Sequence, residues 1–290
     1  MKLSIMFITY NRKKELLRAL ESCVSNKMDD MEIIIVDNHS TDGSQQLIEE
    51  FLKSKNILYK YFYSDINLGI SEGRNKAFEL CEGDFVLCLD DDAVIASNHF
   101  FEKICNEMYK RDAIAAAVCI YEPESNKYLK GYTYKKNNES LALSYVGAAH
   151  VLKRKFFAGK VLYPSTLKFG SEELYVAYRI RKYNKKMIYI DDAVVYHLPS
   201  KVARVYGEER KINIITNTYI IRKMCYPKSI LPILTIFLFI RIVKHKYYRN
   251  GYYKKISNMI RERYLDKYVD RMGYKEFLKM IADVGITQVF

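Results

Sequence analysis

The sequence predicts an α/β fold with a largely parallel central sheet. Two observations carry this prediction. Apolar, β-rich runs alternate with runs of helical spacing through residues 3–90, which is typical of βαβ units. Each apolar run is also followed by a polar segment. With 290 residues, of which 49% are hydrophobic and 28% charged, the chain is long enough for one large domain and an appendage.

The order of the elements follows from these patterns. "LSIMFITY" and "MEIIIVD" are strand-like, whereas "KKELLRALESCVS" places apolar residues at helical spacing. The expected strands in the first part are 3–10, 31–37, 57–64 and 84–90, and the expected helices are 13–25, 44–54 and 71–81. Further on we expect a helix at 98–111, a strand at 113–121, a hairpin or surface loop at 122–140, a strand and turn at 145–157, a helix at 171–184 and two short strands within 186–198.

The polar segments that follow the first four strands indicate where a site lies. They read "ITYNR", "VDNHSTDGS", "YSDINLG" and "LDDDA". Ligands of parallel α/β sheets bind at the carboxyl ends of the strands. The sequence therefore predicts a binding site at this edge of the sheet.

Three consecutive aspartates, Asp90–Asp92, follow the apolar run "FVLCL". Like charges this close raise one another's pKa unless a cation or hydrogen-bond donors compensate them. A solvated turn or helix cap is the simpler interpretation. A carboxylate cluster after a buried strand also suits Mg²⁺ or Mn²⁺, which prefer oxygen ligands and share them with phosphates.

Two further positions have both a structural and a chemical interpretation. Glu172 and Glu173 begin a predicted helix, where acids stabilise the N-terminus, and Glu173 is also a candidate general base. His197 ends an apolar strand, where a lone histidine is more often structural than a ligand. A metal site close by would favour the ligand role.

Several functional classes lose support. The chain has no G-x-x-x-x-G-K-[ST] loop, no G-x-G-x-x-G loop and no evident Ser-His-Asp arrangement. Its six cysteines show no C-x-x-C spacing, so we expect reduced, buried thiols and a cytoplasmic protein. The N-terminal apolar run is expected to be a first strand and not a targeting segment.

The ordered set of motifs resembles the family 2 glycosyltransferases. The elements are "SIMFITYNR", "IIIVDNHSTDGS", "NLGISEGRNKAFELCEGDFVLCLDDDAVI" and "FGSEELYVAYRIRKYNKKMIYIDDAVVYHLPS". The resemblance implies the GT-A nucleotide-diphospho-sugar transferase fold, with a mainly parallel central sheet flanked by helices. It covers residues 2–200 and predicts a catalytic domain at 1–205 with a C-terminal helical extension at 206–290.

The resemblance also implies a set of donor-binding residues. Thr9, Tyr10, Asn11 and Arg12 line the nucleotide base pocket. Asp37 and Asn38 recognise the base and ribose. Arg74 lies against the base or diphosphate, and Asp91 lies nearer the ribose. The set is Thr9, Tyr10, Asn11, Arg12, Asp37, Asn38, Arg74, Asp90 and Asp91.

The remaining positions of the resemblance imply the chemistry. Asp90–Asp92 match the D-x-D element, with Asp92 and Asp90 as ligands of Mn²⁺ or Mg²⁺. His197 falls where rhamnosyl- and galactofuranosyl-transferase-like members place a third ligand. Glu173 matches the catalytic base, a position that is more often aspartate.

The implied activity is metal-dependent and inverting. A sugar, as a hexosyl or deoxyhexosyl group, moves from a UDP- or dTDP-sugar to a hydroxyl of a glycan or lipid-linked acceptor in surface polysaccharide biosynthesis. Two alternatives stay open, a sugar nucleotidyltransferase and a non-catalytic sugar-nucleotide-binding protein. A nucleotidyltransferase is expected to have a glycine-rich loop after its first strand, and "ITYNRKKE" has no glycine.

The C-terminal segment differs from the rest in charge. Residues 206–290 carry 17 Lys and Arg against 7 Asp and Glu, out of a net charge of +13 for the chain. The apolar run 229–243 has 15 residues, fewer than the roughly 20 that a spanning helix needs. Together these features predict peripheral binding to an anionic membrane surface on the cytoplasmic face. A homo-oligomer helix is the alternative, and nucleic acid is not expected because it would not need the apolar run.

Overall fold

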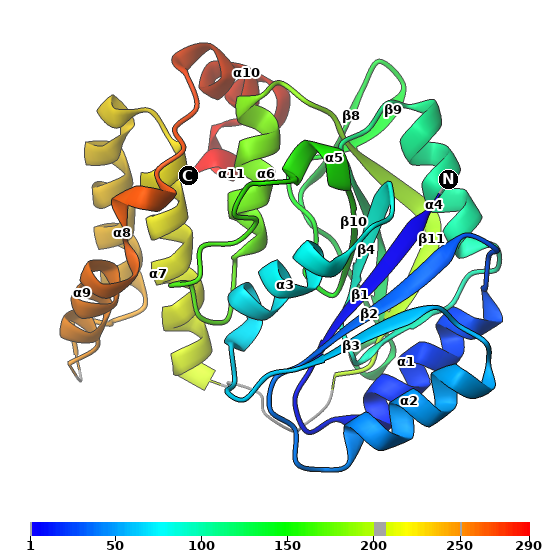
Figure 1. Cartoon of the computed structure of the whole chain (residues 1–290). Coiled ribbons are helices and arrows are strands. Elements are labelled where there is room, and N and C mark those ends of the chain that lie inside the picture. Colours follow the sequence, from blue (N-terminus) through cyan, green and yellow to red (C-terminus); the bar gives the residue numbers. More distant parts are fainter. Residues whose placement is uncertain (1, 200–206, 250) are drawn as a thin grey trace. The chain divides into compact units, whose positions relative to one another are not determined.

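The computed structural model describes residues 2–199, 207–249 and 251–290 of the chain (Figure 1). These residues form two units. The first comprises the described residues up to Leu162 and those from 186 to 199, and the second comprises Tyr163–Lys185 and the described residues from 207 onward. The predicted boundary between residues 205 and 206 lies outside the described residues.

The first unit is built on one mixed sheet. Its strand order is β3-β2-β1-β4-β10-β6-β11-β9-β8, with β5 paired to β11 and β7 paired to β6. The strands are β1 (Leu3–Thr9), β2 (Met31–Asp37), β3 (Tyr59–Tyr63), β4 (Phe85–Leu89), β5 (Ala93–Ile95), β6 (Ala115–Glu122), β7 (Lys127–Leu129), β8 (Thr133–Lys136), β9 (Glu139–Ala142), β10 (Ala149–Lys153) and β11 (Met187–His197). The helices of this unit are α1 (Lys13–Ser25), α2 (Ser44–Ser54), α3 (Gly69–Leu80), α4 (Phe100–Lys110), α5 (Arg154–Phe157) and the 3-10 helix η1 (Pro123–Ser125).

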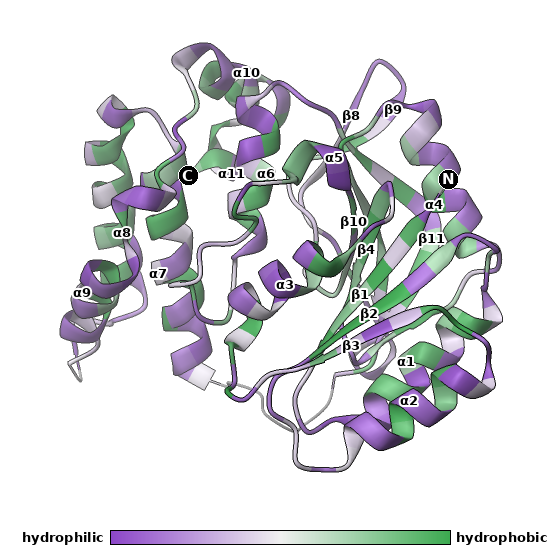
Figure 2. Ribbon diagram, in the orientation of Figure 1, coloured by the Kyte–Doolittle hydropathy of each residue, from purple (hydrophilic) through white to green (hydrophobic). Residues whose placement is uncertain are grey.

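The N-terminal half of the sheet is parallel, as predicted. β1 pairs in parallel with β2 and β4, and β2 pairs in parallel with β3. Every residue of β2 and β4 is buried, which is typical of parallel strands covered on both faces. Helix α3 covers one face, and α1 and α2 cover the other (Figure 1). In Figure 2 β1 and β4 are coloured hydrophobic along most of their length.

The second half of the sheet differs from a simple βαβ repeat. β10 runs antiparallel between β4 and β6, so the whole sheet is mixed. The predicted hairpin in 122–140 is confirmed as β8 and β9, which are joined by Asn137 and Asn138 at positive φ. The two short strands predicted within 186–198 form one strand, β11. That prediction was wrong because an irregularity between Ile190 and Val194 shifts the pairing to β6 without ending it.

The second unit is helical. Its elements are α6 (Glu173–Lys182), α7 (Gly207–Cys225), η2 (Lys228–Ile230), α8 (Leu231–Lys244), α9 (Tyr252–Arg263), η3 (Asp266–Tyr268), α10 (Tyr274–Val284) and α11 (Ile286–Val289). Buried apolar residues of α7, α8 and α9 form a small core that includes Ile212, Leu238 and Ile256. Helix α6 packs against α7 and α10, so residues 163–185 belong with the C-terminal helices. Among the described residues, no helix is both long enough and apolar enough to span a membrane.

Candidate functional site

The polar strand ends of the first unit gather at one edge of its sheet. Thr9 and Asp37 are paired in register at the ends of β1 and β2, and β4 lies on the other side of β1. β11 brings His197 opposite Ala93, the residue after the aspartate triplet. The strand register therefore brings Thr9, the aspartates and His197 to one edge of the sheet.

Each aspartate of the triplet has a basic partner, and the partners come from different elements. Arg74 Nη2 on α3 lies 2.8 Å from Asp90 Oδ1. Arg12 Nη1, just before α1, lies 2.9 Å from Asp91 Oδ1 and 3.4 Å from Asp92 Oδ2. These contacts compensate the repulsion among three adjacent carboxylates.

Asp91 is buried, and hydrogen bonds hold its carboxylate in place. Its carboxylate accepts hydrogen bonds from Thr9 Oγ1 at 3.0 Å and from Arg12. Burial raises the pKa of Asp91 to about 7; Arg12 acts to lower this pKa, and Asp92 acts to raise it further. Burial has the largest single effect on the pKa of the Arg12 guanidinium and acts to lower it, but Asp91, Asp92 and Asp90 together raise this pKa above its usual value.

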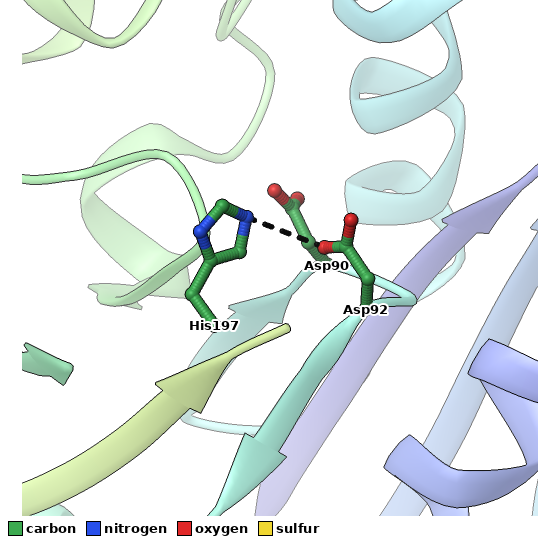
Figure 3. A group of neighbouring side chains, drawn as sticks. All are labelled: Asp90, Asp92 and His197. Carbon is green, nitrogen blue, oxygen red and sulfur yellow. Dashed lines mark ion pairs between the residues drawn. The ribbon is translucent and has the colours of Figure 1, made fainter. Parts of the chain in front are cut away.

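Asp90, Asp92 and His197 form a cluster of possible metal ligands (Figure 3). One ligand atom from each residue lies within 4.8 Å of those of the other two. His197 Nε2 is 3.5 Å from Asp92 Oδ1. Two carboxylates and an imidazole suit Mn²⁺ and related divalent ions, so the residues present fit such a metal. The structure thus brings together the three residues that were predicted as ligands.

His197 also has a partner on the side of the ring away from Asp92. Its Nδ1 lies 3.3 Å from Glu122 Oε1, at the end of the neighbouring strand β6. Ser125 Oγ donates to the other oxygen of Glu122 at 2.6 Å, so this carboxylate is itself held in place. Histidines that bind metals commonly have a carboxylate at the other ring nitrogen, which orients the ring. Nothing in the sequence pattern singles out Glu122.

One of the predicted donor-binding residues, Asn11, joins the turns that follow β1 and β2. The Asn11 backbone N–H donates to Ser40 Oγ at 2.8 Å, and Asn11 Oδ1 accepts from the Thr41 N–H at 2.8 Å. Asn11 has a φ of 53°, a conformation that asparagine tolerates better than most residues. Tyr10 beside it is exposed and accessible to a ligand.

Asp37 and Asn38 are both buried at the end of β2. The Asp37 carboxylate accepts from the Ser40 N–H at 2.7 Å and from the Tyr61 hydroxyl at 2.5 Å. Burial and this carboxylate raise the pKa of Tyr61. Asn38 Nδ2 donates to the Gly69 carbonyl at 3.3 Å, at the start of α3. Tyr61, which orients Asp37, lies on β3, and no sequence motif marks it.

Arg74 is buried on α3 and donates both to Asp90 and to the Gly147 carbonyl, the latter at 3.0 Å. Glu173, the predicted base, is the first residue of α6 in the second unit. Its neighbour Glu172 is buried and accepts a hydrogen bond from the Gly170 N–H at 3.1 Å. The role of Glu173 as a base stays a prediction.

Residues 4–171 match the model of glycosyl transferase family 2, which is more than half of the chain. It is 31% identical over 123 residues to the putative glycosyltransferase EpsH of Bacillus subtilis, covering 42% of this chain and 34% of that protein. It is 28% identical over 142 residues to the GalNAc(5)-diNAcBac-PP-undecaprenol beta-1,3-glucosyltransferase of Campylobacter jejuni, covering 48% and 45%. The chain thus spans less than half the length of either relative.

Solved structures share the fold. TarS of S. aureus has a TM-score of 0.64 at 18% identity, covering 87% of this chain and 74% of that chain. GalNAc-T7 with UDP, GalNAc and Mn²⁺ has a TM-score of 0.70 at 15% identity, covering 97% and 56%. The mannosyltransferase PcManGT of Pyrobaculum calidifontis with GDP-Man and Mn²⁺ has a TM-score of 0.61 at 17% identity, covering 82% and 69%. At such identities the likeness establishes the GT-A fold alone.

Proposed function

The chain belongs to glycosyl transferase family 2, and from this premise we propose that it is a metal-dependent, inverting glycosyltransferase. The observation that carries the proposal is the cluster of Asp90, Asp92 and His197 at the carboxyl edge of the sheet. Sugar nucleotides carry a diphosphate whose charge grows as the sugar leaves, and such a site supplies the stabilisation that this needs. When bound, a divalent cation held by these three residues supplies charge neutralisation for the departing diphosphate.

The residues of the chain have the following roles in the proposal. Arg12 and Thr9 hold Asp91, which faces the ribose of the donor. Tyr10, Asn11, Asp37 and Asn38 form the pocket for the base. Glu173 removes the proton from the acceptor hydroxyl at its carboxylate, and the hydroxyl oxygen then attacks the anomeric carbon from the face opposite the leaving group.

The donor and the acceptor are proposed by class. We assign a UDP- or dTDP-sugar as donor, and the segment "VDN" with Asp37 and Asn38 favours a deoxyhexose or furanose. GalNAc-T7 is solved with UDP, which supports a uridine nucleotide. The Campylobacter jejuni relative acts on an undecaprenol-linked glycan by its name, which supports a lipid-linked acceptor and a place in surface polysaccharide biosynthesis.

The donor assignment is tested by hydrolysis. The full chain is incubated with a panel of UDP-, dTDP- and GDP-sugars, and nucleotide release is measured with Mn²⁺ and with EDTA. Release from a UDP- or dTDP-sugar that requires the metal supports the proposal. Metal-independent release contradicts it. When pyrophosphate is added, formation of a nucleoside triphosphate and a sugar 1-phosphate from the sugar nucleotide also contradicts it, because that is the reverse reaction of a nucleotidyltransferase.

We further propose that the C-terminal unit binds peripherally to an anionic membrane surface on the cytoplasmic side. The supporting observations come from α8. On α8, Leu234, Leu238 and Ile242 face the core at intervals of four residues. Most other large apolar residues of this helix are exposed, namely Ile233, Ile236, Phe237, Phe239, Ile240 and Val243. The exposed lysines Lys244 and Lys246 follow this face directly. An exposed apolar face beside basic residues is what interfacial membrane helices carry.

This assignment is tested by flotation of the full chain with vesicles of phosphatidylcholine alone or with phosphatidylserine. Binding that needs the anionic lipid and weakens with salt supports the proposal, since exposed charges are screened within about 10 Å at 0.1 M salt. Failure to float together with a stable dimer in solution would assign the same face to a second copy of the chain.

A further inference from the structure

The segment that leads into α6 is held by a buried side chain of α7. Asn217 is fully buried, and its Nδ2 donates to the carbonyls of Lys168 at 3.0 Å and Gly170 at 2.7 Å. Its Oδ1 accepts from Arg263 Nη1 of α9 at 2.8 Å. Both ends of the amide are therefore used, and α7, α9 and the segment before Glu173 are joined through one residue.

This segment has a backbone that needs such support. Gly170 has a φ of 105° and Ser171 a φ of 68°, so two consecutive residues adopt left-handed conformations. Such conformations persist only where the surroundings hold them. A Cβ atom on residue 170 would lie 3.0 Å from Ile214 Cγ1 of α7. The backbone at Gly170 is therefore packed closely against that helix. Thr218, one residue after Asn217, contributes a contact to the Ser171 hydroxyl at 3.2 Å.

Helix α6 itself is tied to the same C-terminal elements further along its length. The Tyr175 hydroxyl donates to the carbonyl of Tyr268 in η3 at 2.8 Å. Arg179 Nε lies 2.9 Å from Asp270, and Arg181 Nη2 lies 3.0 Å from Asp283 of α10. The C-terminal helices thus hold both the segment that enters α6 and the helix beyond its first turn, with Glu173 between these contacts.

From these contacts we infer that the C-terminal helices position the general base, and that Asn217 is the positioning residue. The inference rests on the proposed function, because it takes Glu173 as the base. Asn217 fixes the carbonyls of Lys168 and Gly170, which sets the point where α6 begins and hence where the Glu173 carboxylate points. Displacement of a catalytic group by about 1 Å can lower a rate by about 100-fold, so loss of these bonds affects turnover.

The first experiment measures hydrogen exchange at the backbone amides of 168–173 in the full chain. Asn217→Asp keeps the size of the side chain and its bond to Arg263 but removes the two donors to the segment. Thr216→Val is the matched control, because the buried Thr216 hydroxyl has no hydrogen-bond partner among the described residues. We expect exchange in 168–173 to become at least about tenfold faster in Asn217→Asp, as for the loss of one hydrogen bond, and unchanged in Thr216→Val.

Thr218→Val is a milder variant that removes only the contact to Ser171. It is expected to accelerate exchange in the same segment to a smaller extent, and it keeps the inference testable if Asn217→Asp does not fold. Equal exchange rates in wild type, Thr216→Val and every folded variant at Asn217 or Thr218 would overturn the inference.

The second experiment separates a positioning role from general stability. With a donor that the hydrolysis panel identifies, Asn217→Asp should lower kcat by about 10- to 100-fold with an unchanged KM for the donor. In a Glu173→Gln background the same substitution should have no further effect. If Glu173→Gln alone keeps full turnover, the base assignment in the proposed function fails, while the exchange data still decide whether Asn217 holds the segment. An additional loss of kcat in the double variant, or faster exchange with unchanged kcat, would overturn the positioning of the base by Asn217.

Discussion

Asp92→Asn tests the metal site with the smallest change of shape. Wild-type protein should unfold at a higher temperature in the presence of Mn²⁺, whereas the variant should lose this response. A ligand present at 100 times its Kd stabilises the folded state by about 2.7 kcal/mol, which is a rise of several degrees for a chain of this size. The variant removes one of the two carboxylates from the cluster of Asp90, Asp92 and His197.

The stability of the metal-free protein should stay level or rise, because the repulsion and desolvation that the variant relieves match or exceed the attraction that it loses. At an effective dielectric constant of about 20, the attraction between Asp92 and Arg12 at 3.4 Å is about 5 kcal/mol. The variant also loses the repulsion from Asp90, whose ligand oxygen lies within 4.8 Å, an effect of about 3.5 kcal/mol before solvent screening of the more exposed Asp90. It further avoids the desolvation of a buried carboxylate, which costs several kcal/mol.

The assay is thermal unfolding of wild type, Asp92→Asn and Asp65→Asn, each with Mn²⁺ and with EDTA. Asp65 is exposed and serves as the control for loss of one negative charge. An equal Mn²⁺ response in wild type and Asp92→Asn would refute the metal assignment. A large loss of stability in metal-free Asp92→Asn would mean that the lost attraction to Arg12 outweighs the relieved repulsion and desolvation, and it would refute this reasoning.

Three further predictions concern other residues. Glu173→Gln should lower transfer by at least about 100-fold while donor affinity is kept, as measured by steady-state kinetics and calorimetry; greater damage from Glu172→Gln would move the base by one position. Glu122→Gln should weaken Mn²⁺ binding by about 10-fold, measured by electron paramagnetic resonance of free Mn²⁺, because the His197 ring loses its orienting carboxylate; an unchanged affinity contradicts this role. Burial lowers the pKa of His150 well below its usual value, so the unfolded chain binds a proton more readily. The free energy of unfolding should therefore fall as pH drops below about 6.5, by up to about 1.4 kcal/mol per pH unit. His150→Phe should reduce this slope in denaturant titrations at pH 5 to 7, and equal slopes would contradict the assignment.

The N-terminal elements were predictable because their signals are local. The apolar spacing of 13–25 matches the helix that the structure has at Lys13–Ser25, and 31–37 matches β2. The D-x-D element and His197 were predicted together through the resemblance, and the strand register of β11 brings them together in the structure. Strand β5 was missed, since three residues after the triplet give no usable periodicity.

The contacts that hold the site could not be predicted from the sequence pattern. Arg12 and Asp91 are 79 residues apart, and Asn217 and Gly170 are 47 apart. Neither Tyr61 nor Glu122 stands out in the sequence, because a tyrosine in a strand and a glutamate in a polar loop are ordinary there. Their roles depend on strand register and on which side chain faces which, and these are properties of the tertiary fold.

The charge compensation of the triplet has a consequence for ligand binding. Arg12, Arg74 and His197 reach the aspartates from separate elements, and Arg74 and His197 have second contacts at the Gly147 carbonyl and at Glu122. The carboxylates cannot spread apart to relieve their repulsion without breaking these contacts. The oxygen atoms of the proposed cation site are therefore held close together by folding and would not have to be ordered when a cation binds. Preorganised polar groups of this kind are the usual source of electrostatic stabilisation in enzymes, because little reorganisation is left for the moment of reaction.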